Sequence, residues 1–277
     1  MKKVKCSPSV QKTDGTCYSN ESLTRLKELW NQRHPDVKIT TNDEREIWNA
    51  LKRYMDDVCD NEKCWLEQEF SKNQLTQELL HYTFIPDAPH EWSDNPTTWL
   101  NSLDIERVMK QYEKKHPHFQ FIGPSPIDFD KRLHYNECVW DDLCNFNVHN
   151  MYKKGKTHTG FIFNLDPHYK SGSHWVSMYL NMNEGYIFFF DSTGENVPSE
   201  IKNFMNRITT QCSNIDVDLE HIVNKKEHQK SNTECGMYSL HMIIAILDER
   251  KHPKHFSEKH ISDAKMKKLR KELFHHK

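Results

Sequence analysis

The sequence predicts an α+β protein with a helical N-terminal part. Three observations predict this fold class. Apolar residues recur at helical spacing through about the first 85 residues. From about residue 119, short aromatic and β-branched runs bounded by turn residues predict strands, for example at residues 161–163. An apolar run at 240–247 then predicts a buried helix. The order of helices, strands and helices is typical of an α+β fold.

The N-terminal helices can be placed from their caps. Asn20 or Ser22 is expected to cap the first, which ends near Pro35. The second opens at residues 41–44 and carries apolar residues at helical spacing out to Val58. A short third helix is predicted through residues 65–70.

A boundary follows these helices. Pro86, Pro89 and Pro96 break any helix in this stretch, and an amphipathic helix with Ile105 and Tyr112 on one face comes after it. We therefore predict a helical N-terminal domain over residues 1–90 and a core domain over 91–277.

Composition excludes several classes of protein. The 277 residues include only 8 glycines, too few for glycine-rich phosphate-binding loops. The net charge of −2 and the 11% aromatic content argue against disorder. No apolar run approaches the roughly 18 residues of a membrane span, and the N-terminus lacks the apolar region of a signal peptide. We expect an intracellular protein without membrane contact.

The eight cysteines carry no recognisable pairing motif. None forms a Cys-x-x-Cys pair, so a zinc ribbon or a thioredoxin-type site has no support. Without a secretion signal, a disulfide framework is not expected. Each cysteine is expected to be a small buried residue, and Cys59 and Cys64 are interpreted as packing residues rather than as a redox pair.

A predicted hairpin brings a histidine to an aspartate. Two strand-like runs flank the polar loop at residues 181–184. If Leu180 pairs with Gly185, His174 lies directly opposite Asp191, with Cβ atoms roughly 5 Å apart. An imidazole held by a carboxylate is the base and its orienter in a nucleophilic triad. A surface pair that closes a sheet edge is the alternative. The face shared with His174 is expected to carry Val176, Met178, Leu180, Ile187 and Phe189.

Cys235 is the candidate nucleophile. It lies between a polar loop and the apolar run at 240–247, so we place it at a helix N-terminus, where unpaired N–H groups favour the thiolate. Gln229 can bring its side-chain amide to the same place, and both groups can then face an oxyanion. The alternative is a core cysteine that starts a helix.

These residues together resemble the ubiquitin-like-protein (SUMO) protease and adenovirus-protease clan of cysteine peptidases. The order His174-Trp175, Asp191, Gln229 and Cys235-Gly236 is the clan's order of His, Asp or Asn, Gln and Cys. Residues 98–105 resemble its Trp-Leu-Asn-Asp motif, except that Ser102 replaces the usual aspartate. The resemblance covers about residues 97–274. Within the clan, the proteases of large cytoplasmic DNA viruses, asfarviruses included, look most similar.

The resemblance implies a papain-like fold and a role for each residue. Cys235 is the nucleophile, His174 the general base and then the acid, and Asp191 the orienter, while Gln229 completes the oxyanion hole. The core, with its mixed or antiparallel sheet, is then the protease domain, and residues 1–90 are an arm domain. No cofactor and no metal are implied.

The resemblance also implies a specificity. The clan's tryptophans corresponding to Trp99 and Trp175 flank a slot that only glycines pass, and we expect Gly236 and Asn232 to contact the substrate as well. Cleavage after Gly-Gly in viral polyproteins is the favoured function, in the host cytoplasm or the virion. Core packing is the alternative for both tryptophans.

Three other functions stay open at this stage. They are deconjugation of SUMO or ubiquitin-like modifiers, acetyl transfer by the same triad, and non-enzymatic binding. The stretch 250–277 holds ten Lys and Arg against three acids, which permits nucleic-acid binding. An amphipathic helix with Met266 and Leu273 on one face is the simpler interpretation, and we do not favour a nucleic-acid partner. Histidine pairs such as His116/His118 have metal-ligand spacing but no partner set.

Overall fold

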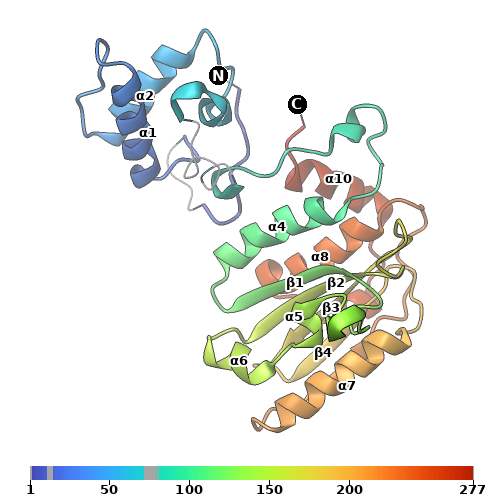
Figure 1. Cartoon of the computed structure of the whole chain (residues 1–277). Helices are drawn as coiled ribbons and strands as arrows, with labels where there is room; N and C mark the ends of the chain where they lie inside the picture. Colours follow the sequence, from blue (N-terminus) through green and yellow to red (C-terminus); the bar gives the residue numbers. More distant parts are fainter. Residues whose placement is uncertain (1, 11–14, 72–78, 80, 277) are drawn as a thin grey trace. The chain divides into compact units, whose positions relative to one another are not determined.

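The computed structural model describes residues 2–10, 15–71, 79 and 81–276 (Figure 1). The chain forms two compact units, Met1–Asp87 with Phe274–Lys277, and Ala88–Leu273. The division into an arm domain over 1–90 and a protease core over 91–277 stays a prediction. In the part of the chain that the structure describes, no helix is both long and apolar enough to cross a membrane.

The first unit contains both predicted helices, with corrected ends. Helix α1 spans Asn20–Arg33, and its N-cap is Ser19, whose side chain accepts a hydrogen bond from the Ser22 N–H. The predicted caps were wrong because Asn20 and Ser22 already lie inside the helix. Helix α2 spans Glu44–Met55 with Asp43 as its cap. It ends before Val58, which is 63% exposed, because the chain turns there to bury Cys59.

Short 3₁₀ turns replace the predicted third helix. Segments η1, Glu62–Glu67, and η2, Glu69–Ser71, bury Trp65 and Phe70 in the core of this unit. The apolar positions were therefore predicted correctly, whereas the helix type was not. Such tight turns are used in short pieces because their hydrogen-bond geometry is poorer than that of an α-helix.

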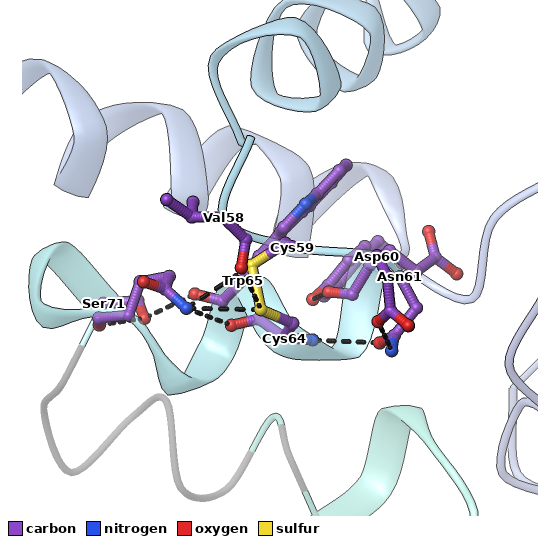
Figure 2. The surroundings of a disulfide bond; sticks show 10 residues. Val58, Cys59, Asp60, Asn61, Cys64, Trp65 and Ser71 are labelled. Atoms are coloured by element: carbon purple, nitrogen blue, oxygen red, sulfur yellow. Dashed lines mark hydrogen bonds between the residues drawn. A yellow bond between two sulfur atoms is a disulfide. The ribbon is translucent and has the colours of Figure 1, made fainter. Parts of the chain in front are cut away.

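The expectation that the cysteines are unpaired was wrong. Six of them form disulfides, Cys6–Cys17, Cys59–Cys64 and Cys138–Cys144. Figure 2 shows the second of these beside Trp65 and Ser71, where it closes the turn after α2. The partners are 11, 5 and 6 residues apart, and turns of the backbone bring their Cα atoms within 6.3 Å. The sequence pattern does not specify these turns. Cys212 and Cys235 are free and buried.

The second unit is built on a five-stranded mixed sheet in the order β1-β2-β3-β4-β5. The β1–β2 and β4–β5 pairs are parallel, and the two central pairs are antiparallel. The strands are β1 Phe119–Pro126, β2 His158–Asn164, β3 Trp175–Asn181, β4 Tyr186–Phe190 and β5 Glu220–Val223. The predicted α+β class, with a mixed central sheet packed by helices, is confirmed.

Helices cover both faces of this sheet (Figure 1). Helix α7, Ser199–Ser213, packs on one face, and α4, Ser102–Lys115, and α8, Cys235–Glu249, pack on the other. The shorter elements are η3 His90–Ser93, η4 His134–Asn136, α5 Asp141–Cys144, α6 Val148–Lys153 and α9 Lys254–Glu258, with α10 at Asp263–Leu273.

Every residue of β3 and β4 is buried, as predicted for central strands. The face that carries Val176 and Phe189 meets Phe204 and Ile208 of α7 in one apolar cluster. On the other face, Phe188 and Phe190 pack against Phe256 of α9. Apolar cover on both sides fixes the two strands that lead to the candidate site.

Candidate active site

His174 and Asp191 meet at one end of the hairpin. His174 comes directly before β3, and Asp191 directly follows β4. The His174 Nε2 lies 2.8 Å from Asp191 Oδ1. The Asp191 side chain is 2% exposed and that of His174 is 19% exposed. The carboxylate is thus held away from solvent while the imidazole keeps an open edge.

The register of the hairpin differs from the predicted one by two residues. Leu180 pairs with Ile187, not with Gly185, and Asn181 pairs with Tyr186. Gly185 instead lies in the loop with φ +68°, where an added Cβ would meet the Asp218 carbonyl oxygen at 2.7 Å. Because side chains alternate with period two, a shift of two residues keeps every side chain on its predicted face. His174 reaches Asp191 along a diagonal instead of directly across.

Several interactions fix the Asp191 carboxylate. Its Oδ1 accepts hydrogen bonds from the Thr193 N–H at 2.9 Å and the Thr193 hydroxyl at 2.8 Å. Burial raises the pKa of Asp191, but the hydrogen bond and charge of His174 and the Thr193 donors outweigh burial and lower the pKa overall. Asp191 is therefore an anion at neutral pH.

Electrostatics keep a proton on His174. Burial lowers the pKa of its imidazole, but hydrogen bonding to Asp191 and to Cys235, together with the charges of both, raises the pKa to about 10. Nε2 faces Asp191, so Nδ1 is the ring nitrogen left for the Cys235 sulfur. The imidazole thus lies between the carboxylate of Asp191 and the sulfur of Cys235.

Cys235 is the first residue of α8. Its N–H group therefore has no partner within the helix, and it lies at the positive end of the helix dipole. The apolar run that follows is buried from Cys235 to Ile246. The predicted helix and the place of Cys235 at its start are both found. A buried helix holds the sulfur at a fixed position beside the imidazole.

Gln229 lies in the loop before α8 and is bound to the residue after Asp191. Its backbone N–H donates to the Ser192 carbonyl at 2.9 Å, and its Oε1 accepts from the Ser192 hydroxyl at 2.8 Å. Its Nε2 donates to the Ser231 carbonyl at 2.6 Å. An amide nitrogen carries two hydrogens, so the second stays available to an incoming oxygen.

The two predicted tryptophans contact the same region. Trp175 is buried and donates its indole N–H to the Leu100 carbonyl at 3.0 Å. Trp99 is 37% exposed and donates to the Asn232 carbonyl at 2.7 Å. Gly236 packs beneath Trp175, since a Cβ added there would lie 3.3 Å from Cδ1 of that indole. All four residues of the predicted substrate site are thus linked to the start of α8.

A cavity of about 580 Å³ opens beside the tryptophans. Its lining includes Trp99 and Trp175, together with Trp140 from the disulfide-closed turn at Cys138–Cys144. Gly172, two residues before His174, belongs to the same lining. Its volume lies within the range of about 300–1,000 Å³ that is typical of ligand-binding pockets.

Sequence reasoning missed the residues that fix the loop before Cys235. Glu234, at the N-cap position of α8, forms a buried ion pair with Arg270 of α10, with Nε and Oε2 2.8 Å apart. Tyr238 and Asp263 hold the other end of the loop. The helical spacing of Met266 and Leu273 did predict α10. One of its basic residues points inward, however: Arg270 lies four residues after Met266 and three before Leu273, on the same face of the helix.

A substitution of Asp263 tests whether this loop holds Gln229 in place. Its carboxylate accepts hydrogen bonds from the backbone N–H groups of Lys230 at 3.1 Å and Ser231 at 2.9 Å, and from the Tyr238 hydroxyl at 2.9 Å. We expect Asp263→Ala to release these groups and shift Gln229. Since losing one oxyanion donor outright costs about 10²–10³-fold in kcat, we expect a loss of about 10-fold, with KM nearly unchanged.

Steady-state kinetics on a peptide substrate check this expectation. Asp130→Ala is a suitable control, because Asp130 pairs with Arg207 on α7 and does not contact the loop. Equal kcat in the Asp263→Ala variant and the wild type would show that Gln229 does not depend on this anchor.

The histidine pairs do not assemble into a metal site. His118 contacts both His116 and His158 through its ring. Among residues 2–10, 15–71, 79 and 81–276, however, no group of three or more His, Cys, Asp or Glu side chains is placed to hold a metal ion.

The chain is similar to known viral proteases. Residues 154–277 match the model of the Ulp1 protease family, C-terminal catalytic domain. These residues, somewhat less than half of the chain, are thus similar to the catalytic domain of that family. A thiol protease of Acanthamoeba polyphaga mimivirus is 27% identical over 266 residues, which cover 87% of this chain and 84% of that protein. A SUMO-1 cysteine protease of African swine fever virus is 28% identical over 255 residues, covering 86% and 91%.

The fold agrees with this assignment. The crystal structure of the African swine fever virus protease matches with a TM-score of 0.68 and 24% identity over 99% of this chain and 96% of that one. The expected resemblance to viral Ulp1-type proteases is confirmed. The chain is a cysteine protease.

Proposed function

We propose that this Ulp1-type protease is an endopeptidase that cleaves viral polyproteins after Gly-Gly. One observation carries the proposal. The His174 ring is bonded to the buried carboxylate of Asp191 on one side and interacts with Cys235, at the start of α8, on the other. This is the arrangement of nucleophile, base and orienter that acyl transfer to a thiol requires.

Each residue then has a step in peptide hydrolysis. His174 already carries the proton that the leaving amine will need, and the Cys235 sulfur attacks the scissile carbonyl carbon. The Cys235 N–H and Gln229 Nε2 donate to the oxyanion that forms. His174 next gives its proton to the leaving amine, so the peptide C–N bond breaks and an acyl-enzyme remains. A water molecule, deprotonated by His174, hydrolyses this thioester and frees Cys235.

The tryptophans supply the proposed glycine specificity. Trp99 is tied to the segment just before Cys235, and Trp175 packs over Gly236 just after it. A peptide that reaches the sulfur passes between these rings. A residue without a Cβ fits such a slot most easily, so the two residues before the cut are proposed to be glycines.

Viral polyproteins are the favoured substrates because the alignments with both viral relatives extend over most of this chain, N-terminal residues included. We place the reaction in the host cytoplasm or the virion. The name of the African swine fever virus relative favours a second candidate, removal of a SUMO-like modifier. Acetyl transfer, a non-enzymatic role and nucleic-acid binding have no comparable support.

A peptide series tests the specificity. We expect a Gly-Gly-X peptide to be cleaved after the second glycine, and replacement of either glycine by alanine to lower kcat/KM by about 10²-fold or more, because an added Cβ must pass between two indoles. Fluorescence-quenched peptides measure the rates, and mass spectrometry gives the cut site. Equal rates of cleavage for Gly-Gly and Ala-Ala peptides would contradict the proposal that the two tryptophans form a slot that selects glycine.

A second assay separates the substrate classes. The enzyme is incubated with a Gly-Gly-X polyprotein fragment and, separately, with a SUMO fusion that carries the same cut site. Faster cleavage of the fragment supports the polyprotein function. Faster cleavage of the fusion supports deconjugation, and activity only with acetyl-coenzyme A would indicate acetyl transfer.

A further inference from the structure

We propose that Arg270 is a positioning residue that fixes the Trp99 segment against the nucleophile loop. The Trp99 segment is residues 97–99, and the nucleophile loop is residues 229–234. This inference rests on the proposed function, because it assigns the device that sets the glycine slot. Arg270 lies on α10, near the end of the second unit, and is far in sequence from both segments.

The buried ion pair is the first contact. Arg270 Nε lies 2.8 Å from Glu234 Oε2, and the two side chains are 3% and 0% exposed. Glu234 directly precedes Cys235. The guanidinium also lies over the Trp92 ring, 4.5 Å from its centroid. Stacking and pairing together leave the planar group one orientation.

The remaining guanidinium hydrogens bridge the two segments. On one side they donate to the Thr98 carbonyl at 2.8 Å and the Thr97 carbonyl at 3.5 Å. On the other side they donate to the Thr233 carbonyl at 2.9 Å. Thr98 directly precedes Trp99, and Thr233 lies two residues before Cys235. One side chain therefore ties the backbone beside the slot tryptophan to the backbone beside the nucleophile.

The bonding pattern favours positioning over simple stabilisation. A buried ion pair costs desolvation energy, and well-packed apolar residues often stabilise a fold as well or better. Apolar residues cannot, however, bond carbonyls of two separate segments at once. The indole N–H of Trp99 adds a second tie between the same segments at the Asn232 carbonyl. Arg270 and Trp99 thus tie the same two segments together at separate points.

The test compares Arg270→Met with the double variant Arg270→Met, Glu234→Leu. The single variant leaves a buried carboxylate unpaired, so we expect lower thermal stability and lower activity. The double variant removes both charges, and we expect its melting temperature to return toward the wild-type value. Its kcat/KM for a Gly-Gly-X peptide stays about 10-fold down, and its preference for Gly-Gly over Ala-Gly narrows. Arg270→Lys is expected to restore neither the wild-type kcat/KM nor the wild-type preference for Gly-Gly, because one ammonium group cannot donate to carbonyls on both sides.

Two further measurements separate positioning from folding. Hydrogen–deuterium exchange is expected to rise in residues 97–99 and 231–234 together in the double variant. Alkylation of Cys235 by iodoacetamide stays near the wild-type rate, because His174 is untouched. Arg207→Met is the matched control, since Arg207 makes a bidentate pair with Asp130 away from the site. It is expected to change neither exchange in these segments nor specificity.

The outcomes are distinct. A double variant with wild-type specificity and wild-type exchange overturns the inference. A wild-type enzyme that does not cleave Gly-Gly-X peptides overturns the proposed function. In that case, the exchange of the two segments still decides whether Arg270 holds them.

Discussion

Replacing Cys235 by serine is expected to abolish cleavage of a Gly-Gly-X peptide, whereas Cys212→Ala leaves it intact. These are the two free cysteines of the protein, and both are buried. They differ in their surroundings. Cys235 starts α8 beside His174, while burial in α7 raises the pKa of Cys212 to about 11. A thiol held in its neutral form is inert.

The expected loss for Cys235→Ser is about 10⁴-fold or more in kcat, since a serine hydroxyl is a far weaker nucleophile than the cysteine sulfur. Circular dichroism should show an unchanged fold, because serine is close to cysteine in shape. A thiol-reactive Gly-Gly probe is expected to label Cys235 in the wild type and in Cys212→Ala. Turnover in Cys235→Ser equal to that of the wild type would refute the assignment of the nucleophile.

The geometry of the candidate site could be predicted because it depends on local patterns. The alternation of β3 and β4 placed His174 and Asp191 on one face, and this conclusion survived a register error of two residues. An odd-numbered error would have moved one partner to the other face. The apolar run after Cys235 likewise specified α8 and its start.

The supporting interactions could not be predicted, because they join residues that are distant in the sequence. Glu234 and Arg270 are 36 residues apart, and Trp99 reaches the Asn232 carbonyl across 133 residues. The helical spacing does place Arg270 on the face of Met266 and Leu273, but it does not specify which residues Arg270 contacts there. The disulfides depend on backbone turns that composition does not encode.

Asp191 is expected both to orient His174 and to stabilise its positive charge. Two substitutions separate these roles. Asp191→Ala removes both the acceptor that orients His174 and its negative charge. Asp191→Asn keeps one acceptor oxygen for Nε2, removes the charge and replaces the other oxygen by an NH₂ group. We expect kcat to fall about 10²–10⁴-fold for alanine, since the imidazole loses its orientation, and less for asparagine, because the histidine of papain-like Cys-His-Asn sites is oriented by an asparagine.

The pH dependence of Asp191→Asn decides whether the charge matters. In the wild type, Asp191 and Cys235 raise the pKa of His174 to about 10, so the imidazole loses its proton only in alkaline solution. Without the charge of Asp191, this pKa falls toward its ordinary value near 6.5, and the proton needed for the leaving amine is lost at lower pH. The alkaline limb of the kcat/KM profile therefore shifts to lower pH in Asp191→Asn. Thr193→Val, which removes one donor to Asp191 but keeps its charge, is the control and should leave the limb close to the wild-type position. An unshifted limb in Asp191→Asn would mean that Asp191 acts through orientation alone.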